Sequence, residues 1–187
     1  MTLIHLIIFT ILIPGSVAWW IPSLLSRQWP AQFNIAPWNY AGITLVVVGA
    51  LFYFRSALSF LIEGKGTPAI WFTRSIRFLV GEEPGVFVSG GFYTKTRNPM
   101  YLGVVTCVFG EAVFFERWVL LEYSAVLWLF FHIVIVVVEE PHLREKFGMS
   151  YEQHLRSVPR WISLRHSAYA NEAPMHPTHG DIIFLGD

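Results

Sequence analysis

The sequence predicts an all-α integral membrane protein, with about four transmembrane helices and a C-terminal amphipathic helix on the cytoplasmic side. Of its 187 residues, 54% are hydrophobic and only 14% are charged, whereas soluble domains carry roughly 25% charged residues. The apolar residues gather in runs of about 17 to 25, the length that crosses ~30 Å of hydrocarbon as a helix. These two observations exclude a soluble globular domain.

A first transmembrane helix is expected over residues 3–25, with a kink or break near Pro14 and Gly15. The small residues Ser16–Ala18 also fit the cleavage site of a signal peptide. Against that alternative, no basic segment precedes the apolar run, and apolar residues continue through Trp19–Ile21. We therefore predict a retained span.

The second and third spans are expected at residues 40–62 and 99–115. Arg55 lies roughly two turns before the end of the second, close enough for its side chain to reach the headgroups. The third begins at Pro99, which suits the first turn of a helix because its missing N–H is not needed there. Asn98, just before it, is a favourable N-cap residue.

A tight connection at Glu116 and Arg117 leads to a fourth span, expected at residues 119–138. The distribution of basic residues predicts how the four spans are oriented in the membrane. Five of them lie between residues 63 and 98 and five follow Glu140, whereas the connections on the other side contain Arg27 and Arg117. We expect the long loop and both termini to be cytoplasmic, in a bacterial inner membrane or an equivalent membrane.

Residues 139–161 are expected to form a helical cytoplasmic cap, with Gly148 as a weak point inside it. Beyond this cap the chain loses its periodicity, so we predict one transmembrane domain over residues 1–166 and a flexible tail over residues 167–187. The apolar stripe of the cap consists of residues four apart, namely Leu143, Phe147, Tyr151 and Leu155.

The composition excludes several kinds of site. The formal net charge is zero, so the chain has no electrostatic footprint for nucleic acid. Cys107 is the only cysteine and lies inside an apolar run, which excludes an intramolecular disulfide and a cysteine-rich metal site. His176 and His179 flank Pro177 in the tail and do not amount to a metal site. We predict no metal.

Polar residues recur on one face of the third and of the fourth span. Arg97, Tyr101 and Glu111 share a helix face, and Glu111 falls well inside the membrane. His132 and Glu139 are two turns apart, ~10 Å along the axis. Intramembrane carboxylates are costly and usually face a cavity. Each feature also has a plainer explanation, because an acidic pair can mark the end of a span and a buried polar group can be merely satisfied.

Two polar stripes on neighbouring helices predict a pocket that opens to the cytoplasm and closes toward lipid. One cation, two anions and hydrogen-bonding groups suit a zwitterionic cofactor with a carboxylate, an amine and a ribose. The predicted walls are Val104, Val108, Phe131 and Val136, an apolar lining that favours an apolar acceptor. At the mouth we expect Arg97, Asn98, Tyr101, Glu139 and Glu140.

Two motifs resemble a known family. The first is Gly-Phe-Tyr-x3-Arg-Asn-Pro-Met-Tyr-Leu-Gly at residues 91–103, and the second is Glu-Glu-Pro-x-Leu-x3-Phe-Gly-x2-Tyr-x6-Val-Pro-Arg-Trp at residues 139–161. Separated by a hairpin of apolar spans, they resemble the isoprenylcysteine carboxyl methyltransferase family and, more broadly, membrane phospholipid methyltransferases. The resemblance covers about residues 90–161. It implies S-adenosylmethionine as methyl donor at the cytoplasmic membrane face.

In that family an Arg-His-Pro-x-Tyr region and a Glu-Glu pair line the cofactor site. The chain departs from this pattern at Asn98, where many members have histidine, although an amide can still form hydrogen bonds. The residues before position 90 match no motif, so the acceptor is not implied. The cofactor-binding residues expected from the resemblance and its surroundings are Gly91, Tyr93, Arg97, Asn98, Pro99, Tyr101, Glu139 and Glu140.

The acceptor is expected to be a small hydrophobic or lipid-like molecule that presents a thiol, carboxylate or amine. A carboxylate or thiolate needs no base, whereas a neutral amine or thiol must lose a proton. Glu111 and His132 are the embedded candidates for removing it, and are our predicted catalytic residues.

Two other functions stay open. A membrane reductase of the sterol-reductase type would use NADPH, whose 2′-phosphate needs a basic pocket, and the paired glutamates argue against that. In a non-catalytic membrane subunit, Glu111 and His132 would make assembly contacts.

Overall fold

The computed structural model describes residues 2–64 and 85–162. These residues form helices and connecting turns. They contain one isolated β-bridge, between Gln32 and Arg117, and no β-strand. The predicted tail at residues 167–187 lies outside the described residues. So do His176, His179 and most of the long loop on which the charge bias depends.

The first helix is broken where the sequence predicts. Helix α1 (Thr2–Leu12) is followed by a π-helix (Ser16–Trp20) and by α2 (Ile21–Gln28). Pro14 has no N–H to donate to the preceding turn, so the regular α-helical ladder is interrupted there. A π-helix has about one residue more per turn than an α-helix. The side chains after it therefore point in a different direction from those of an uninterrupted α-helix.

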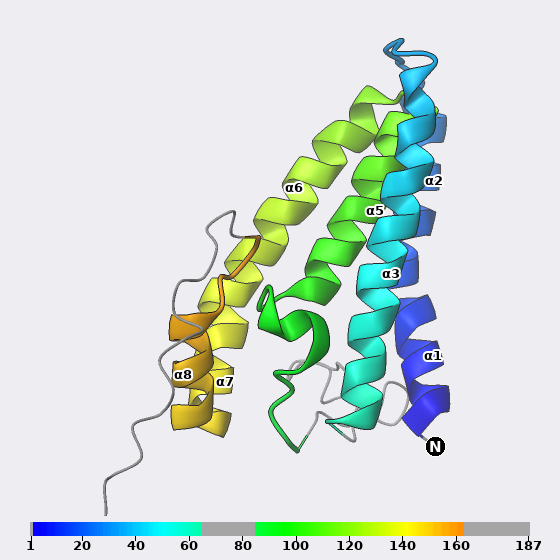
Figure 1. Cartoon of the computed structure of the whole chain (residues 1–187). Helices are drawn as coiled ribbons and strands as arrows, with labels where there is room; N and C mark the ends of the chain where they lie inside the picture. Colours follow the sequence, from blue (N-terminus) through cyan, green and yellow to red (C-terminus); the bar gives the residue numbers. More distant parts are fainter. Residues whose placement is uncertain (1, 65–84, 163–187) are drawn as a thin grey trace, which may run out of the picture.

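Helices α3 (Ala41–Ile62) and α5 (Pro99–Phe115) occupy the residues predicted for the second and third spans and run side by side in opposite directions (Figure 1). Glycines make their contact close. A Cβ atom added at Gly49 would lie 2.6 Å from the carbonyl oxygen of Gly103, and one added at Gly42 would lie 2.5 Å from that of Gly110. Small residues of this kind allow membrane helices to approach closely.

The connection between α5 and α6 (Trp118–Val134) is the predicted tight turn. Glu116 takes a left-handed conformation with φ of 54°. Its carboxylate accepts a hydrogen bond from the Ile35 N–H at 2.7 Å, and its backbone carbonyl accepts one from Phe33. Arg117 donates to the Pro30 carbonyl. The two connections at this end of the bundle are thus tied together.

The predicted cap is two helices rather than one. After α6 a π-helix (Ile135–Glu139) leads into α7 (Glu140–Phe147), and α8 (Met149–Ser157) follows. Gly148 separates them with φ of 53° and ψ of −126°, a conformation that side chains disfavour. Gly148 therefore breaks the cap, and α8 folds back beside α7 (Figure 1).

Within the described residues, three helical segments are long and apolar enough to cross a membrane, namely Leu3–Gln28, Trp38–Ile62 and Trp118–Phe147. Helix α5 is apolar but has only 17 residues. Large apolar side chains such as Leu51, Phe54 and Phe130 are exposed on the outer faces, as lipid-facing residues are. The chain is a multi-pass membrane protein. Figure 1 places its N-terminus at the same end of the bundle as α7 and α8.

Candidate functional site

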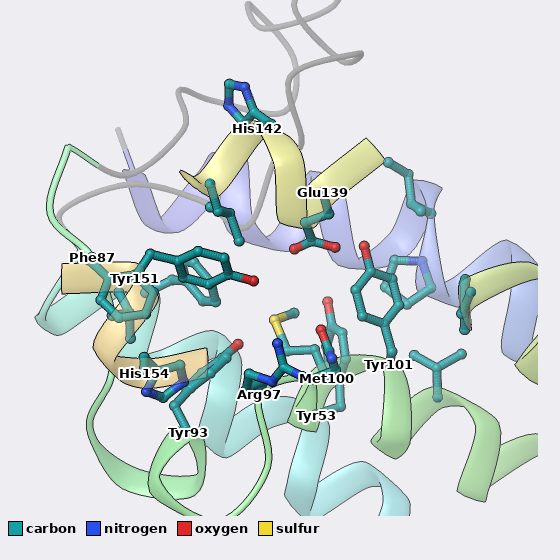
Figure 2. Close-up of a pocket in the computed structure, with 18 of the residues that line it drawn as sticks. Tyr53, Phe87, Tyr93, Arg97, Met100, Tyr101, Glu139, His142, Tyr151 and His154 are labelled. Carbon is teal, nitrogen blue, oxygen red and sulfur yellow. The ribbon is translucent and has the colours of Figure 1, made fainter. Parts of the chain in front are cut away.

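A cavity lies at the end of the bundle that carries α7 and α8 (Figure 2). Its empty volume is about 1270 Å³, counting the part open to solvent, whereas small-molecule sites are typically ~300–1,000 Å³. Helices α1, α3, α5, α6, α7 and α8 contribute to its lining, together with the segment between residues 86 and 98. It is therefore built from both halves of the chain.

One part of the lining is polar and the other apolar. Apolar side chains come from the first helix and its π-segment, from α3, α5 and α6, and also from residues 86–88 and α7, and they are Phe9, Ile13, Pro14, Val17, Phe60, Val86, Phe87, Val88, Met100, Val104, Phe131, Leu143 and Phe147. Polar side chains come from α3, the start of α5 and the turn before it, the π-segment after α6 and the cap, and they are Tyr53, Tyr93, Arg97, Asn98, Tyr101, Glu139, His142, Tyr151 and His154. The cavity can thus hold a charged group and a hydrophobic group at once.

Arg97 supplies a cation to the cavity wall from a nearly buried position, since its side chain is 11% exposed. Its Nη1 donates to the Glu140 carboxylate at 3.0 Å. Its Nε is buried and has no hydrogen-bond partner among residues 2–64 and 85–162. A buried N–H without a partner is costly, so this atom indicates where a ligand would accept a hydrogen bond.

Glu139 and Glu140 point in different directions. Successive residues on a helix are about 100° apart, so only one of an adjacent pair can face a given side. Glu139 lines the cavity, where its carboxylate lies on the same side as Tyr101 (Figure 2). Glu140 is 3% exposed and does not line it. Its carboxylate accepts two hydrogen bonds from Arg160, at 2.7 and 3.0 Å.

Three titratable groups at the cap end of the cavity are kept neutral. Burial raises the pKa of Tyr151 to about 12 and raises the pKa of Tyr93 well above its usual value. Burial lowers the pKa of His154, and the charge of Arg97 lowers it further. At neutral pH these groups can accept or donate hydrogen bonds without adding charge, whereas Arg97 and Glu139 bring charged groups to the lining formed by the described residues.

The segment after α8 closes one side of the site. The Arg97 N–H donates to the Pro159 carbonyl at 2.9 Å, and the Thr96 hydroxyl donates to the Arg160 carbonyl at 3.2 Å. The Asn98 amide donates to the same carbonyl at 3.0 Å. Asn98 precedes α5 as predicted, but its side chain does not cap the helix, because this contact with the C-terminal segment takes its place.

Five of the eight predicted cofactor-binding residues line the cavity: Tyr93, Arg97, Asn98, Tyr101 and Glu139. The other three lie beside it and shape it. Gly91 has φ of 59° at the start of a short 3₁₀ turn (Gly91–Thr94), Pro99 is fully buried in the first turn of α5, and Glu140 holds the two arginines.

Glu111 and His132 do not line the cavity. The Nδ1 atom of His132 accepts a hydrogen bond from the Trp161 indole at 3.2 Å, and its ring stacks on Trp128 at 5.6 Å. Of the predicted walls, Val104 and Phe131 face the cavity, whereas Val108 is fully buried and Val136 lies elsewhere. The catalytic role of Glu111 and His132 stays a prediction.

Several lining residues were not predicted. Phe9, Ile13 and Val17 belong to the first helix, which carries no motif, and Tyr53 on α3 is hydrogen-bonded to Thr10 at 2.9 Å. Tyr151 and His154 also line the cavity. Tyr151 lies in the quoted second motif, so its spacing offered a signal, whereas the first-helix residues offered none.

Comparison with known proteins identifies the family of the chain. The family model described as phospholipid methyltransferase matches residues 38–150. Over 119 residues the chain is 33% identical to the protein-S-isoprenylcysteine O-methyltransferase of Schizosaccharomyces pombe, covering 60% of this chain and 50% of that protein. The chain thus spans about half the length of that relative. No solved structure matches. Because the family model matches more than half of the chain, this protein belongs to the phospholipid methyltransferase family.

Proposed function

We propose that the protein is an S-adenosylmethionine-dependent methyltransferase that acts on a small hydrophobic or lipid-like acceptor at the cytoplasmic membrane face. One observation carries the proposal. A single cavity joins a polar wall, with Arg97 and Glu139, to an apolar wall from α1, α5 and α6. The methyltransferase family and the similarity to an isoprenylcysteine O-methyltransferase support it.

The polar wall fits the proposed cofactor. The buried Nε of Arg97, without a partner among the described residues, suits a carboxylate, and the Glu139 carboxylate suits an ammonium group or a ribose hydroxyl. Tyr93 and Asn98 add neutral hydrogen-bonding groups. The cofactor supplies a methyl group on a sulfonium, which is already activated for transfer. The protein's own contribution is to orient the two reactants and to exclude water.

The apolar wall limits the acceptor. A charged headgroup buried against Phe9, Val17 and Phe131 would lack partners, so a hydrophobic body with a thiol, carboxylate or amine at its polar end fits better. We propose four membrane crossings, with α5 as the short third one, and the cavity at the cytoplasmic end. Residues 1–166 then act as one domain in which the acceptor arrives from lipid and the cofactor from water.

The predicted proton acceptors can be tested separately from binding. If Glu111 or His132 removes a proton from the acceptor, alanine at that position lowers turnover by ~10²–10⁴-fold and leaves affinity for S-adenosylhomocysteine unchanged. Unchanged turnover in both variants would show instead that catalysis depends on alignment, as expected for a carboxylate or thiolate acceptor.

Titration calorimetry of the purified protein in detergent tests the proposed function. S-adenosylmethionine and S-adenosylhomocysteine are expected to bind and NADPH is not. Binding of NADPH alone would indicate a reductase, and binding of none of the three would indicate a non-catalytic subunit. Either result overturns the proposal.

A further inference from the structure

A cluster of two arginines and one glutamate lies directly behind the polar wall of the cavity. Arg97 precedes α5, Glu140 begins α7 and Arg160 follows α8. The Glu140 Oε1 atom accepts from Arg160 Nε at 2.7 Å and from Arg97 Nη1 at 3.0 Å, and its Oε2 atom accepts from Arg160 Nη2 at 3.0 Å. We refer to these three residues as the arginine–glutamate cluster.

The three side chains of the cluster differ in burial, and their charges do not cancel. The Glu140 side chain is 4% exposed, that of Arg97 11% and that of Arg160 30%. Two guanidinium groups face one carboxylate, so one positive charge remains uncompensated within the cluster. Arg97 is its member on the cavity wall, and Arg97 also has the buried Nε without a partner among the described residues.

The hydrogen bonds fix the three side chains one after another, from Arg160 to Glu140 to Arg97. The two parallel hydrogen bonds from Arg160 set the plane of the Glu140 carboxylate, because a bidentate guanidinium contact is directional. Glu140 in turn sets the position of Arg97 Nη1. Arg160 is itself held through its backbone carbonyl, which accepts from Thr96 and Asn98. Its hydrogen bond to Glu140 raises the pKa of Arg160 above its ordinary value, so its charge is permanent.

We propose that Glu140 and Arg160 are positioning residues that hold Arg97 with its Nε–H, which has no partner among the described residues, and its positive charge toward the carboxylate of the bound cofactor. This inference rests on the proposed function and divides the Glu-Glu pair by role. Glu139 touches the ligand, whereas Glu140 acts on it through Arg97.

The experiment compares two probes that differ only at the relevant end. S-adenosylhomocysteine carries the amino-acid part of the cofactor, whereas 5′-methylthioadenosine keeps the adenine, ribose and thioether and lacks that part, with both its carboxylate and its ammonium group. We expect Glu140→Gln to weaken binding of S-adenosylhomocysteine by about 10- to 100-fold, the scale of one hydrogen bond to a charged group. Binding of 5′-methylthioadenosine should stay within about twofold of wild type.

Arg160→Lys and Arg160→Gln leave the Glu140 and Arg97 side chains unchanged but remove the two parallel hydrogen bonds that orient the Glu140 carboxylate. Lysine retains the charge but not the two parallel hydrogen bonds. We therefore expect Arg160→Lys to weaken binding of S-adenosylhomocysteine, but less than Arg160→Gln does. In an Arg97→Met background, Glu140→Gln should add no further loss, because the residue through which it acts is gone.

Arg144→Gln is the matched control. It removes another arginine–carboxylate contact of the cap, to Glu152 at 2.9 Å, but both partners are exposed and neither lines the cavity. Both probes should bind this variant as they bind wild type.

Equal weakening of the two probes by Glu140→Gln and by Arg160→Gln would overturn the positioning role and indicate general damage to the site. An additional loss in the Arg97→Met background would also overturn it. Failure of the wild-type chain to bind either probe would overturn the proposed function, and this inference with it.

Discussion

Two adjacent glutamates at this site differ in burial and in the direction that their side chains face. Glu139 is half-buried and faces the cavity, whereas Glu140 is buried against two arginines. The same side chain therefore faces the cavity at one position and is an internal charge partner at the next. Which role it takes is set by its direction on the helix, not by its chemistry.

Glu139→Gln should weaken binding of S-adenosylhomocysteine by ~1–3 kcal/mol, because a charged acceptor becomes a neutral one. Titration calorimetry measures the loss. Glu145→Gln is the control, since Glu145 is an exposed residue of α7 and does not line the cavity. Affinity that is the same in both variants and in wild type would remove Glu139 from the proposed site.

His154 makes stability depend on pH in a definite direction. Its pKa is lowered in the folded protein, by burial and by Arg97, so below about 6.5 the unfolded chain binds a proton that the folded chain does not. The stability associated with neutral His154 is present above that value and is lost as pH falls toward the folded-state pKa.

Thermal unfolding in detergent between about pH 7.5 and 5 checks this expectation. The melting temperature should fall with pH below about 6.5, and His154→Gln should flatten that dependence. An identical pH dependence in the variant would show that other groups cause it.

At the scale of elements, the α3–α5 pair forms the close-packed centre of the bundle. Gly42 and Gly49 on α3 are seven residues apart, as are Gly103 and Gly110 on α5, and the two pairs meet in reverse order. Backbone lies against backbone at both contacts. The start of α5, which carries Tyr101 into the cavity, is thereby fixed relative to Tyr53 on α3.

Gly103→Ala tests this contact, because the added Cβ would lie 2.7 Å from the Gly49 carbonyl oxygen and 2.8 Å from the Tyr53 nitrogen. The helices must separate, and we expect a loss of ~1–3 kcal/mol in stability, typical of overpacking. Gly85→Ala is the control, since no atom of the described residues lies within 4 Å of a Cβ there. Equal melting temperatures for the two variants would contradict the close contact.

For the whole molecule, the orientation in the membrane can be tested by chemical labelling. In a Cys107→Ser background, a cysteine at Gly85 should resist membrane-impermeant thiol reagents in intact cells, whereas one at Gln32 should react. Gly85 and Gln32 lie on opposite sides in the proposed arrangement. The reverse pattern would place the cavity on the other side of the membrane.

Much of the fold follows from the sequence because desolvation in lipid selects long apolar runs. Residues 40–62 and 99–115 were expected as spans, and α3 and α5 occupy 41–62 and 99–115. The pairing of α3 with α5 was not predicted, although glycines seven apart in both runs were a usable signal. The division of the cap was only partly predicted, because the backbone angle that Gly148 adopts depends on how α8 folds back.

The site was predicted where its residues are local in sequence and missed where they are distant. Arg97, Tyr101 and Glu139 lie within the two motifs and reach the cavity. Phe9 and the contact of Asn98 with Arg160 depend on segments that meet only in the folded chain. Periodicity cannot show such contacts, because it describes one helix at a time.

The closure of residues 96–98 by residues 159–160 has a consequence for biosynthesis. The apolar helices can enter the membrane in the order in which they leave the ribosome, but the side of the site beside Arg97 is absent until Pro159 and Arg160 have been made. A nascent chain released after Ser157 should therefore insert and span the membrane without binding S-adenosylhomocysteine. The ability to bind the cofactor would then appear in a single step late in translation, after the preceding helices are already in the membrane.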